Sequence, residues 1–536
     1  MNAKIILDRF EELKSERCGY ESDWRSIRKY IRPDVADFSP AALGQPAVAD
    51  RSAIMDGTAE DAAQELASGL SSYLTNPSDR WLSLVLSGQA EVEDPAVLAA
   101  LEFSADAIYA QYAMEEAGFC AAMDECYLDI VSFGTGIISQ IWDWNNRMSR
   151  FKSHSLASCW LDESQHGRVD TVYRLIARSV RQVQQMFDVL PPKLAALAGK
   201  EKPGHLLVLL NAVEPRTDKI VSGAPGNKPV CSFWVSIDTG EMVKESGYDF
   251  LPYHVARWRK LPDEVYGRGP GHKCLPDVKM LNSLERLLVK GTSRLVSPAM
   301  VVDDDAFLMP LNLEPDAVNY KQGPGEMPHA LRFEGNLPFG EEKAGQKREF
   351  IRRCFHNDWL KMEKKNVEMT AYEVQDRREE KLRMLAPNMG RLQSELLGPL
   401  VSVTYSYLSR AGLIPPIIFP MINRKRVEVE YDSPASRAQI GLKVLSLDRF
   451  MQRLVPLGQV AGPQVLTGTI NFERYIQALA RYQGVPRTIL NTPDEIQAAK
   501  EQNQRQQVVQ QASQLAPVAQ SIKTLSEAKD MSWLPL

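Results

Sequence analysis

The segment GRGPGHK, residues 267–273, has the residue types that come nearest to phosphate chemistry in this chain. Glycines and a lysine are the residues that cradle phosphates in nucleotide-binding loops. The segment does not match GxxxxGK followed by serine or threonine, however, and no apolar strand ends immediately before it. We therefore expect a turn that aims the following helix, with Arg268 and Lys273 as surface charges or interface contacts.

No other segment shows the spacing that catalysis or metal binding requires. The sequence SFGTG, residues 132–136, does not match the GxSxG turn of hydrolases, and the seven histidines contain no HExxH pair. Asp303, Asp304 and Asp305 could gather a divalent cation, but their position in a polar loop favours a solubilising role. The seven cysteines form no CxxC pair, and we expect buried thiols. We predict no catalytic residue, no cofactor and no metal.

The composition is that of an ordinary folded chain. Its 536 residues are 44% hydrophobic and 24% charged, which suffices for two or more cores. No stretch approaches the roughly 20 apolar residues that span a bilayer, and the N-terminus becomes charged too soon for a signal peptide. We therefore expect assembly in a cytosol and no membrane contact. A formal charge of −5 argues against a protein that binds nucleic acid tightly over its whole surface. It does not argue against a protein that DNA slides past.

Hydrophobic periodicity predicts an α+β, helix-rich fold. A first amphipathic helix stops at Pro33, a second begins at the capping sequence 56–58, and a third covers about 96–119. In residues 132–144, paired glycines and then alternating apolar residues predict a helix that turns into a strand. Strand composition recurs at 169–176, 206–213, 230–237 and 253–258.

A pair of helices that could form a functional surface begins near residue 264. Glycine and proline open the first of these helices, which is about 20 residues, or roughly 30 Å, long. Some fifty residues of short strand-like pieces follow it, and then a second helix rich in lysine and arginine. The apolar stripe of the first helix comprises Leu275, Val278, Leu281, Leu284 and Leu288. The basic residues of the second helix and the polar loop after it are Lys343, Lys347, Arg348, Arg352, Arg353, Lys361, Lys364 and Lys365.

A long helical stretch covers residues 369–414. It would form a rod of about 65 Å, bent at Pro387 and Pro399. Thr370 and Glu373 match a capping box at its start. One side of the rod carries Met389, Leu392, Leu396, Leu400, Val403 and Tyr407.

This order of elements resembles the head-to-tail connector, or portal, family of podoviruses, the short-tailed bacteriophages. The resemblance rests on YGRGPG and its helix, the insertion, the basic helix, the polar loop and a helix of the form MTAxEVxxRxxExxxxLxP. It also includes ERCGYESDWRSIRKYIRP near the N-terminus and covers most of residues 1–480. The sharpest part is the motif formed by Thr370, Glu373, Arg377 and Glu380.

The resemblance implies a portal fold, assembled as a ring of about twelve copies around a central channel at one capsid vertex of the virion. It implies partners as well: double-stranded DNA passing non-specifically through the channel, the large terminase subunit, then tail or adaptor proteins, and also scaffolding protein and the major capsid protein. The implied parts are a wing (1–263 and 369–485), a stem (264–293 and 339–358), a clip (294–338), a tunnel loop (359–368) and a crown (486–536).

Two sets of residues have candidate roles in such a ring. The leucine stripe of the first stem helix would be buried between neighbouring subunits. The basic residues of the second stem helix and the loop would contact phosphates, or would instead be solvated or pair with Glu341, Glu342, Glu349 and Glu363 across subunits. Two other classes of protein stay open: another phage ring or tail adaptor, and an enzyme whose site is too dispersed to recognise.

Overall fold

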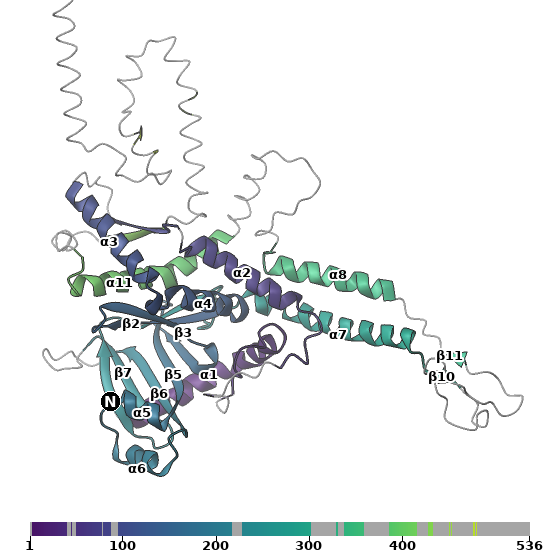
Figure 1. Cartoon of the computed structure of the whole chain (residues 1–536), viewed down its shortest axis with the longest axis horizontal. Coiled ribbons are helices and arrows are strands. Elements are labelled where there is room, and N and C mark those ends of the chain that lie inside the picture. The colour runs from purple at the N-terminus through teal and green to yellow at the C-terminus, as the bar shows by residue number, and fades with distance from the viewer. Residues whose placement is uncertain are drawn as a thin grey trace, which may run out of the picture. The chain divides into compact units, whose positions relative to one another are not determined.

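A computed structural model of the chain confirms the α+β fold. The chain divides into two compact units, of which Met1–Gln89 and Ala100–Ala435 form the first and Ala90–Ala99 and Ser436–Leu536 the second. The account below concerns the first unit (Figure 1). The structure describes residues 3–39, 44, 50–77, 79–86, 95–216, 228–301, 329–330, 337–357, 385–414, 427–431, 450, 452, 475–476 and 479.

The N-terminal helices follow the predicted pattern with one correction. Helix α1 (Ala3–Tyr30) ends before Pro33, and α2 (Thr58–Leu74) begins where the Asp56 carboxylate accepts a hydrogen bond from the Thr58 amide at 2.9 Å. The helix expected over about 96–119 forms as α3 (Pro95–Ala113), but it ends earlier than predicted, where Met114 is extended. The 3-10 turn η2 (Glu115–Ala117) follows, and Gly118, in the left-handed conformation, ends this turn before α4 (Phe119–Phe133) begins.

Two antiparallel sheets, of three and five strands, hold most of the described strands, and β1 (Leu82–Leu86) also pairs antiparallel with β12 (Val427–Tyr431). The predicted change from helix to strand is confirmed, since α4 ends at Phe133 and β2 begins at Thr135. The three-stranded sheet has the order β3-β2-β9, and the five-stranded sheet has the order β4-β5-β6-β7-β8. The strands are β2 (Thr135–Asp143), β3 (Met148–Ser153), β4 (Cys159–Glu163), β5 (Val169–Ser179), β6 (Leu206–Pro215), β7 (Val230–Ser236), β8 (Met242–Tyr248) and β9 (Tyr253–Arg257).

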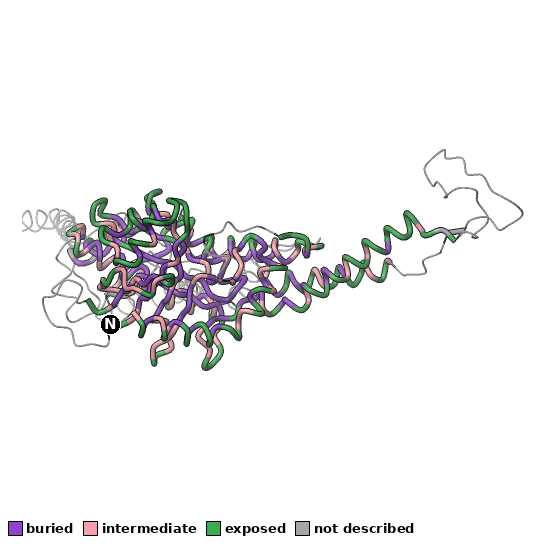
Figure 2. The backbone as a smooth tube through the Cα atoms, turned by 90° about the horizontal axis from the view of Figure 1, so that it is seen from below, coloured by how far each residue is buried: buried purple, intermediate pink, exposed green. Residues whose placement is uncertain are grey.

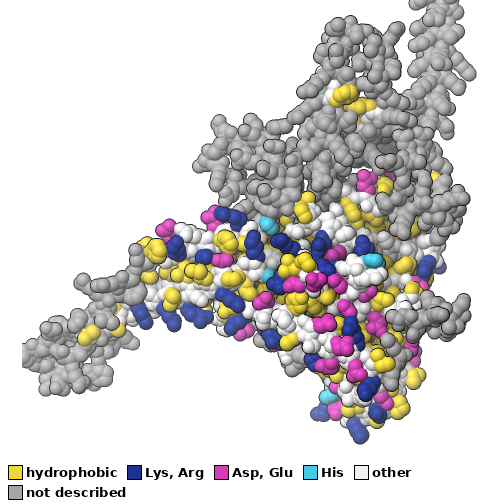
Figure 3. Space-filling view, turned by 180° about the vertical axis from the view of Figure 1, so that it is seen from behind, with side chains coloured by type: hydrophobic (Ala, Val, Ile, Leu, Met, Phe, Trp, Pro, Cys, Tyr) yellow, Lys and Arg dark blue, Asp and Glu magenta, His cyan; other side chains and the backbone are white. Residues whose placement is uncertain are grey.

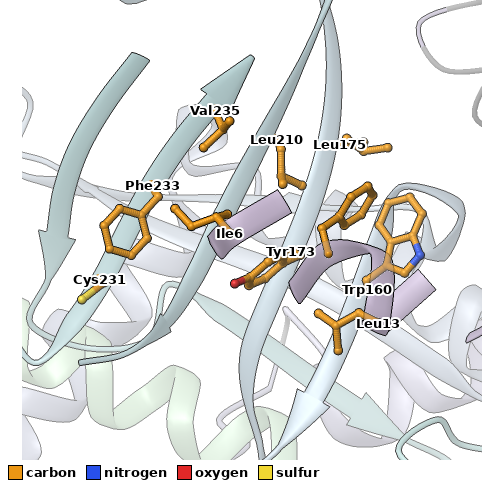
Figure 4. Close-up of a cluster of buried hydrophobic side chains, with 11 residues drawn as sticks. Ile6, Leu13, Trp160, Tyr173, Leu175, Leu210, Cys231, Phe233 and Val235 are labelled. Atoms are coloured by element: carbon orange, nitrogen blue, oxygen red, sulfur yellow. The ribbon is translucent and has the colours of Figure 1, made fainter. Parts of the chain in front are cut away.

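The five-stranded sheet is covered on both faces, which explains why β6 reads as a continuous apolar run. On one face, Ile6 and Leu13 of α1 pack with Trp160, Leu210 and Phe233 (Figure 4). On the other face, helices α5 (Val180–Met186) and α6 (Pro192–Lys200) bury alternate residues of the same strand, such as Leu209.

The long C-terminal helix is described from residue 385. The helical residues 385–392 lead into a π-helical turn, η4 (Gln393–Leu397), and then into α11 (Gly398–Arg410). The π turn precedes Pro399, whose ring nitrogen cannot donate, and the Gly398 amide bonds to the Gln393 carbonyl instead. The predicted apolar side is confirmed, because Met389, Leu392, Leu396, Leu400, Val403 and Tyr407 are all buried.

The cysteines depart in part from the expectation of buried thiols. Five of the seven are buried, but Cys18 and Cys120 are exposed, because each lies on the outward side of its helix.

A buried polar network ties α11 to the three-stranded sheet. The Gln140 side-chain amide donates to Thr404 Oγ1 at 2.8 Å, and its oxygen lies 3.1 Å from His254 Nε2. Tyr112 Oη lies 3.2 Å from the same Thr404 oxygen. Burial lowers the pKa of His254 to about 4. The network is therefore built around a neutral imidazole.

This network makes stability depend on pH. His254 is neutral in the folded chain down to pH about 4 but takes up a proton below pH about 6.5 when unfolded, so its contribution is lost as the pH falls through this window. When the pH is lowered from 7 to 4.5, the free energy of unfolding falls in both proteins. The fall is expected to be about 2–3 kcal/mol smaller in His254→Asn than in the wild type. Denaturant titrations at both pH values measure this difference. Asp129, whose pKa burial raises to about 6, acts in the opposite direction but cancels because both proteins carry it. Parallel losses in the two proteins would contradict the assignment.

Candidate functional site

Helices α7 (Pro270–Val296) and α8 (Leu337–Cys354) form an arm that projects from the sheets (Figure 1). They run side by side in opposite directions, and the body at their base is far more buried than the arm itself (Figure 2). Between them, β10 (Met300–Val301) pairs antiparallel with β11 (His329–Ala330). Helix α7 begins later than expected, because residues 264–269 are not helical. Residues 302–328 of the expected clip lie outside the described residues.

A joint made of glycines sets the direction of α7. A Cβ atom at Gly134 would lie 2.5 Å from the Gly267 oxygen and 2.5 Å from the Gly269 nitrogen, and one at Gly271 would lie 2.3 Å from the Ser132 oxygen. The C-terminal end of α4 therefore packs directly on the backbone that leads into α7, which only glycine permits. The prediction of a turn that aims the helix is confirmed.

The backbone amides of this joint are already in use. The Gly267 amide donates to Thr135 Oγ1 at 2.9 Å, the Arg268 amide to the Arg259 carbonyl at 2.8 Å, and the Gly269 amide to His272 Nδ1 at 3.3 Å. A phosphate loop needs such amides free to point at its ligand. The geometry therefore agrees with the rejection of a phosphate-binding role.

The predicted leucine stripe of α7 is packed largely within the chain. Leu275, Val278 and Leu281 are buried by the chain itself, while Leu284 and Leu288 are half-buried. A Cβ atom at Gly340 of α8 would lie 2.7 Å from Leu288 Cδ2, which shows how closely the two helices approach. The burial of the first three residues thus needs no second subunit. A role of the stripe between subunits stays a prediction.

Two of the predicted basic residues of α8 are bound to acids of the same chain. Lys347 Nζ lies 2.7 Å from Asp277 Oδ1. Arg348 lies 2.7 Å from Asp56 Oδ2 and also contacts Glu285, and the hydrogen bond to Asp56 raises its pKa. These acids are not the glutamates that the sequence suggested. Both cations are therefore engaged with acids of their own chain, although about a third of each side chain is exposed.

The other predicted residues have different environments. Lys343 lies over the Phe339 ring at 5.6 Å, and Arg353 pairs with Glu349 at 3.0 Å one helical turn away. Arg352 is exposed. The remaining candidates, Lys361, Lys364 and Lys365 of the loop and Thr370, Glu373, Arg377 and Glu380 of the motif, lie outside the described residues.

Sequence reasoning missed the basic residues of α7. Lys279, Arg286, Lys290 and Arg294 are exposed, whereas both acids of this helix after its first turn, Asp277 and Glu285, are bound to α8. The exposed charges of α7 are therefore all positive, and Lys and Arg side chains line one edge of the arm (Figure 3). The recurrence of basic residues at positions 279, 286, 290 and 294 is a helical spacing that could have revealed this edge.

A second missed feature is the ionic cluster around Arg257. The Arg257 side chain is 1% exposed and lies 2.9 Å from carboxylate oxygens of both Glu163 and Glu395. Burial opposes its charge, but the hydrogen bonds to Glu395 and Glu163 outweigh burial and raise its pKa. It also donates to the Val265 carbonyl at 3.1 Å. The cluster joins β9, η4 and the segment that precedes α7.

A family model described as "Bacteriophage head to tail connecting protein" matches residues 3–490. The chain belongs to this family. It is 26% identical over 534 residues to the "Probable portal protein" of Bordetella phage BPP-1, covering 96% of this chain and 93% of that protein. It is 25% identical over 544 residues to the "Portal protein" of Salmonella phage epsilon15, covering 98% and 95%. A chain of the "Virion of native gene transfer agent (GTA) particle" aligns with 80% of this chain and 89% of its own at 10% identity, but its TM-score of 0.34 carries no argument.

Membership of the head to tail connecting proteins excludes one of the two classes left open. These proteins are structural, so the alternative of an unrecognised enzyme is set aside. The family match includes both arm helices and ends at residue 490, so nearly all of the expected crown, 486–536, lies beyond it. None of the helices that the structure describes combines the length and apolar character needed to cross a bilayer.

Proposed function

We propose that this connecting protein is the portal subunit of a short-tailed phage. About twelve copies form a ring at one capsid vertex, and double-stranded DNA enters and leaves the capsid through its channel. The large terminase subunit docks on the ring during packaging, and tail or adaptor proteins replace it afterwards. Scaffolding protein and the major capsid protein contact the wing. The division into wing, stem, clip, tunnel loop and crown has the boundaries given above.

The observation that carries this proposal is the exposed arm, taken together with the family match. On α7, Met280 is 53% exposed and Leu287 is 65% exposed, and Phe350 of α8 is also exposed. Monomeric proteins seldom expose several large apolar side chains on one helix pair, because a partner normally covers such a surface. A stem that packs against neighbouring stems in a ring would cover them.

The net charge favours a channel through which DNA moves rather than a surface that binds DNA tightly. Each chain carries a formal charge of −5, so about twelve copies carry roughly −60. A ring with a net negative charge repels the phosphate backbone at long range and limits sticking while DNA moves. The pairing of Lys347 and Arg348 with acids of their own chain is consistent with this weak contact.

Electron microscopy of the purified full-length protein tests the proposed function. Class averages viewed down the symmetry axis are expected to show rings of about twelve subunits with a channel wide enough for a duplex. Because the motor is a separate protein, the same preparation should hydrolyse ATP no faster than buffer. Monomers at every concentration would contradict the proposal.

A further inference from the structure

The outer edge of α7 carries only basic charges, whereas the outer edge of α8 carries Glu342 and also Glu349, which pairs with Arg353 one turn away. Leu288 of α7 contacts Gly340 of α8, and Arg286 and Glu342 each lie two residues from this contact. Two residues correspond to about 200° around a helix, so each side chain points away from the other helix. Lys279 and Glu349 stand in the same relation to the contact between Asp277 and Lys347. We call Lys279, Arg286 and Lys290 the basic edge, and Glu342 and Glu349 the acidic edge.

The charges on the two edges also match in height along the arm. Because α7 and α8 run in opposite directions, moving from Leu288 to Arg286 and from Gly340 to Glu342 goes about 3 Å toward the body in both cases. Arg286 is therefore level with Glu342. By the same reasoning Lys279 and Glu349 lie within about one helical turn of one level.

The two edges cannot meet within one chain, because both helices of the arm lie between them. Among the residues that the structure describes, Arg286 and Lys290 have no acidic partner, whereas Lys279 bonds only to Ser26 Oγ at 3.1 Å. Two different, complementary surfaces on opposite sides of one subunit are what a head-to-tail contact around a rotation axis requires. Equal heights are what a ring without axial rise requires.

We propose that the basic edge of α7 in one copy packs against the acidic edge of α8 in the next copy, with Arg286 paired to Glu342. The partner of this surface is thus a second copy of the chain. The inference rests on the proposed ring and adds which residues close it. DNA phosphates are the rival occupant of the basic edge, but they would leave the acidic edge and the equal heights unexplained. A neighbouring arm also covers Met280 and Leu287, which lie beside the basic edge.

Exchanging the two charges between separate proteins tests the pairing. Arg286→Glu alone places glutamate opposite Glu342 of the next copy, and Glu342→Arg alone places arginine opposite Arg286. Each variant by itself is expected to lose rings at about 0.15 M salt, where screening over about 8 Å confines the repulsion to charges that face each other directly. An equal mixture of the two variants is expected to recover rings, because alternating copies restore an opposite pair at every contact. Sedimentation velocity and electron microscopy measure the fraction of chains in rings.

Lys290→Glu is the matched control. It makes the same charge change on the same edge, but Lys290 is level with Pro338, where no acid stands opposite. It is expected to keep its rings. All three positions are exposed, so circular dichroism and the thermal midpoint of each variant should match those of the wild type.

The possible results test the proposed interface and the proposed portal function separately. Rings formed normally by both single variants, or a mixture that stays unassembled, would overturn the interface while leaving the portal proposal intact. Intact rings of Arg286→Glu that have lost salt-dependent binding to a DNA duplex would overturn it in favour of phosphate contact. A wild type that forms no rings would overturn the proposed function, and the interface with it.

Discussion

Replacing Arg257 by methionine is expected to lower the free energy of unfolding by about 3–5 kcal/mol, the range for a buried ion pair that loses one partner. Methionine retains much of the apolar stem but leaves Glu395, which is 13% exposed, facing a buried site without a cation. Glu163 keeps Lys260 at 2.6 Å, so the loss falls mainly on Glu395. Denaturant titration followed by tryptophan fluorescence measures the change, at a concentration where both proteins have the same oligomeric state.

Two further variants separate the charge from the packing. Replacing both Arg257 and Glu395 by methionine removes the unpaired charge, so the double variant is expected to be more stable than Arg257→Met alone. Arg268→Met is the exposed control, because its pair with Glu264 is a contact at the surface worth about 0.2–1 kcal/mol. If Arg257→Met were no more destabilising than Arg268→Met, the cluster would not be a buried ion pair.

The elements that the sequence predicted well are those with local signals. Helix α1 and the strands β5, β6, β7 and β9 follow from periodicity and from the turn residues around them. The Gly-Pro pair at 269–270 opens α7 as predicted, although the expected bounds of this helix began at residue 264. The end of the third helix was predicted at about 119, whereas α3 stops at Ala113 and a 3-10 turn follows that ends at Gly118.

The predicted partners were less accurate than the elements, because an apolar or charged stripe shows that a face is covered but not by what. The stripe on α7 was predicted to be buried between subunits; the chain itself buries Leu275, Val278 and Leu281, and a role of the stripe between subunits stays a prediction. Lys347 and Arg348 were expected to contact phosphates, to be solvated or to pair with glutamates across subunits. They pair instead with Asp277 and Asp56 of their own chain, 70 and 292 positions away. Which distant segments meet depends on tertiary packing that no local pattern encodes.

Substituting Gly134 by alanine is expected to lower the free energy of unfolding by about 2–5 kcal/mol and to reduce ring formation. Gly134 has φ +79°, a left-handed conformation that costs an alanine about 1–2 kcal/mol. Its new Cβ would also lie 2.5 Å from both the Gly267 oxygen and the Gly269 nitrogen. Because these are backbone atoms rather than the ends of flexible side chains, the segment that aims α7 must shift, at a cost of about 1–3 kcal/mol. Denaturant titration and electron microscopy read the two effects.

Gly240→Ala isolates the conformational part of this loss. Gly240 also has a positive φ, +67°, but nothing lies within 4 Å of a Cβ placed there, so only about 1–2 kcal/mol should be lost and rings should persist. Gly345→Ala, in α8 with open space around it, should instead gain about 0.5–1 kcal/mol. If Gly134→Ala were as stable as Gly240→Ala, the backbone before α7 would shift to accept the new Cβ at little cost. The direction of the arm would then not depend on the contact between α4 and the segment before α7.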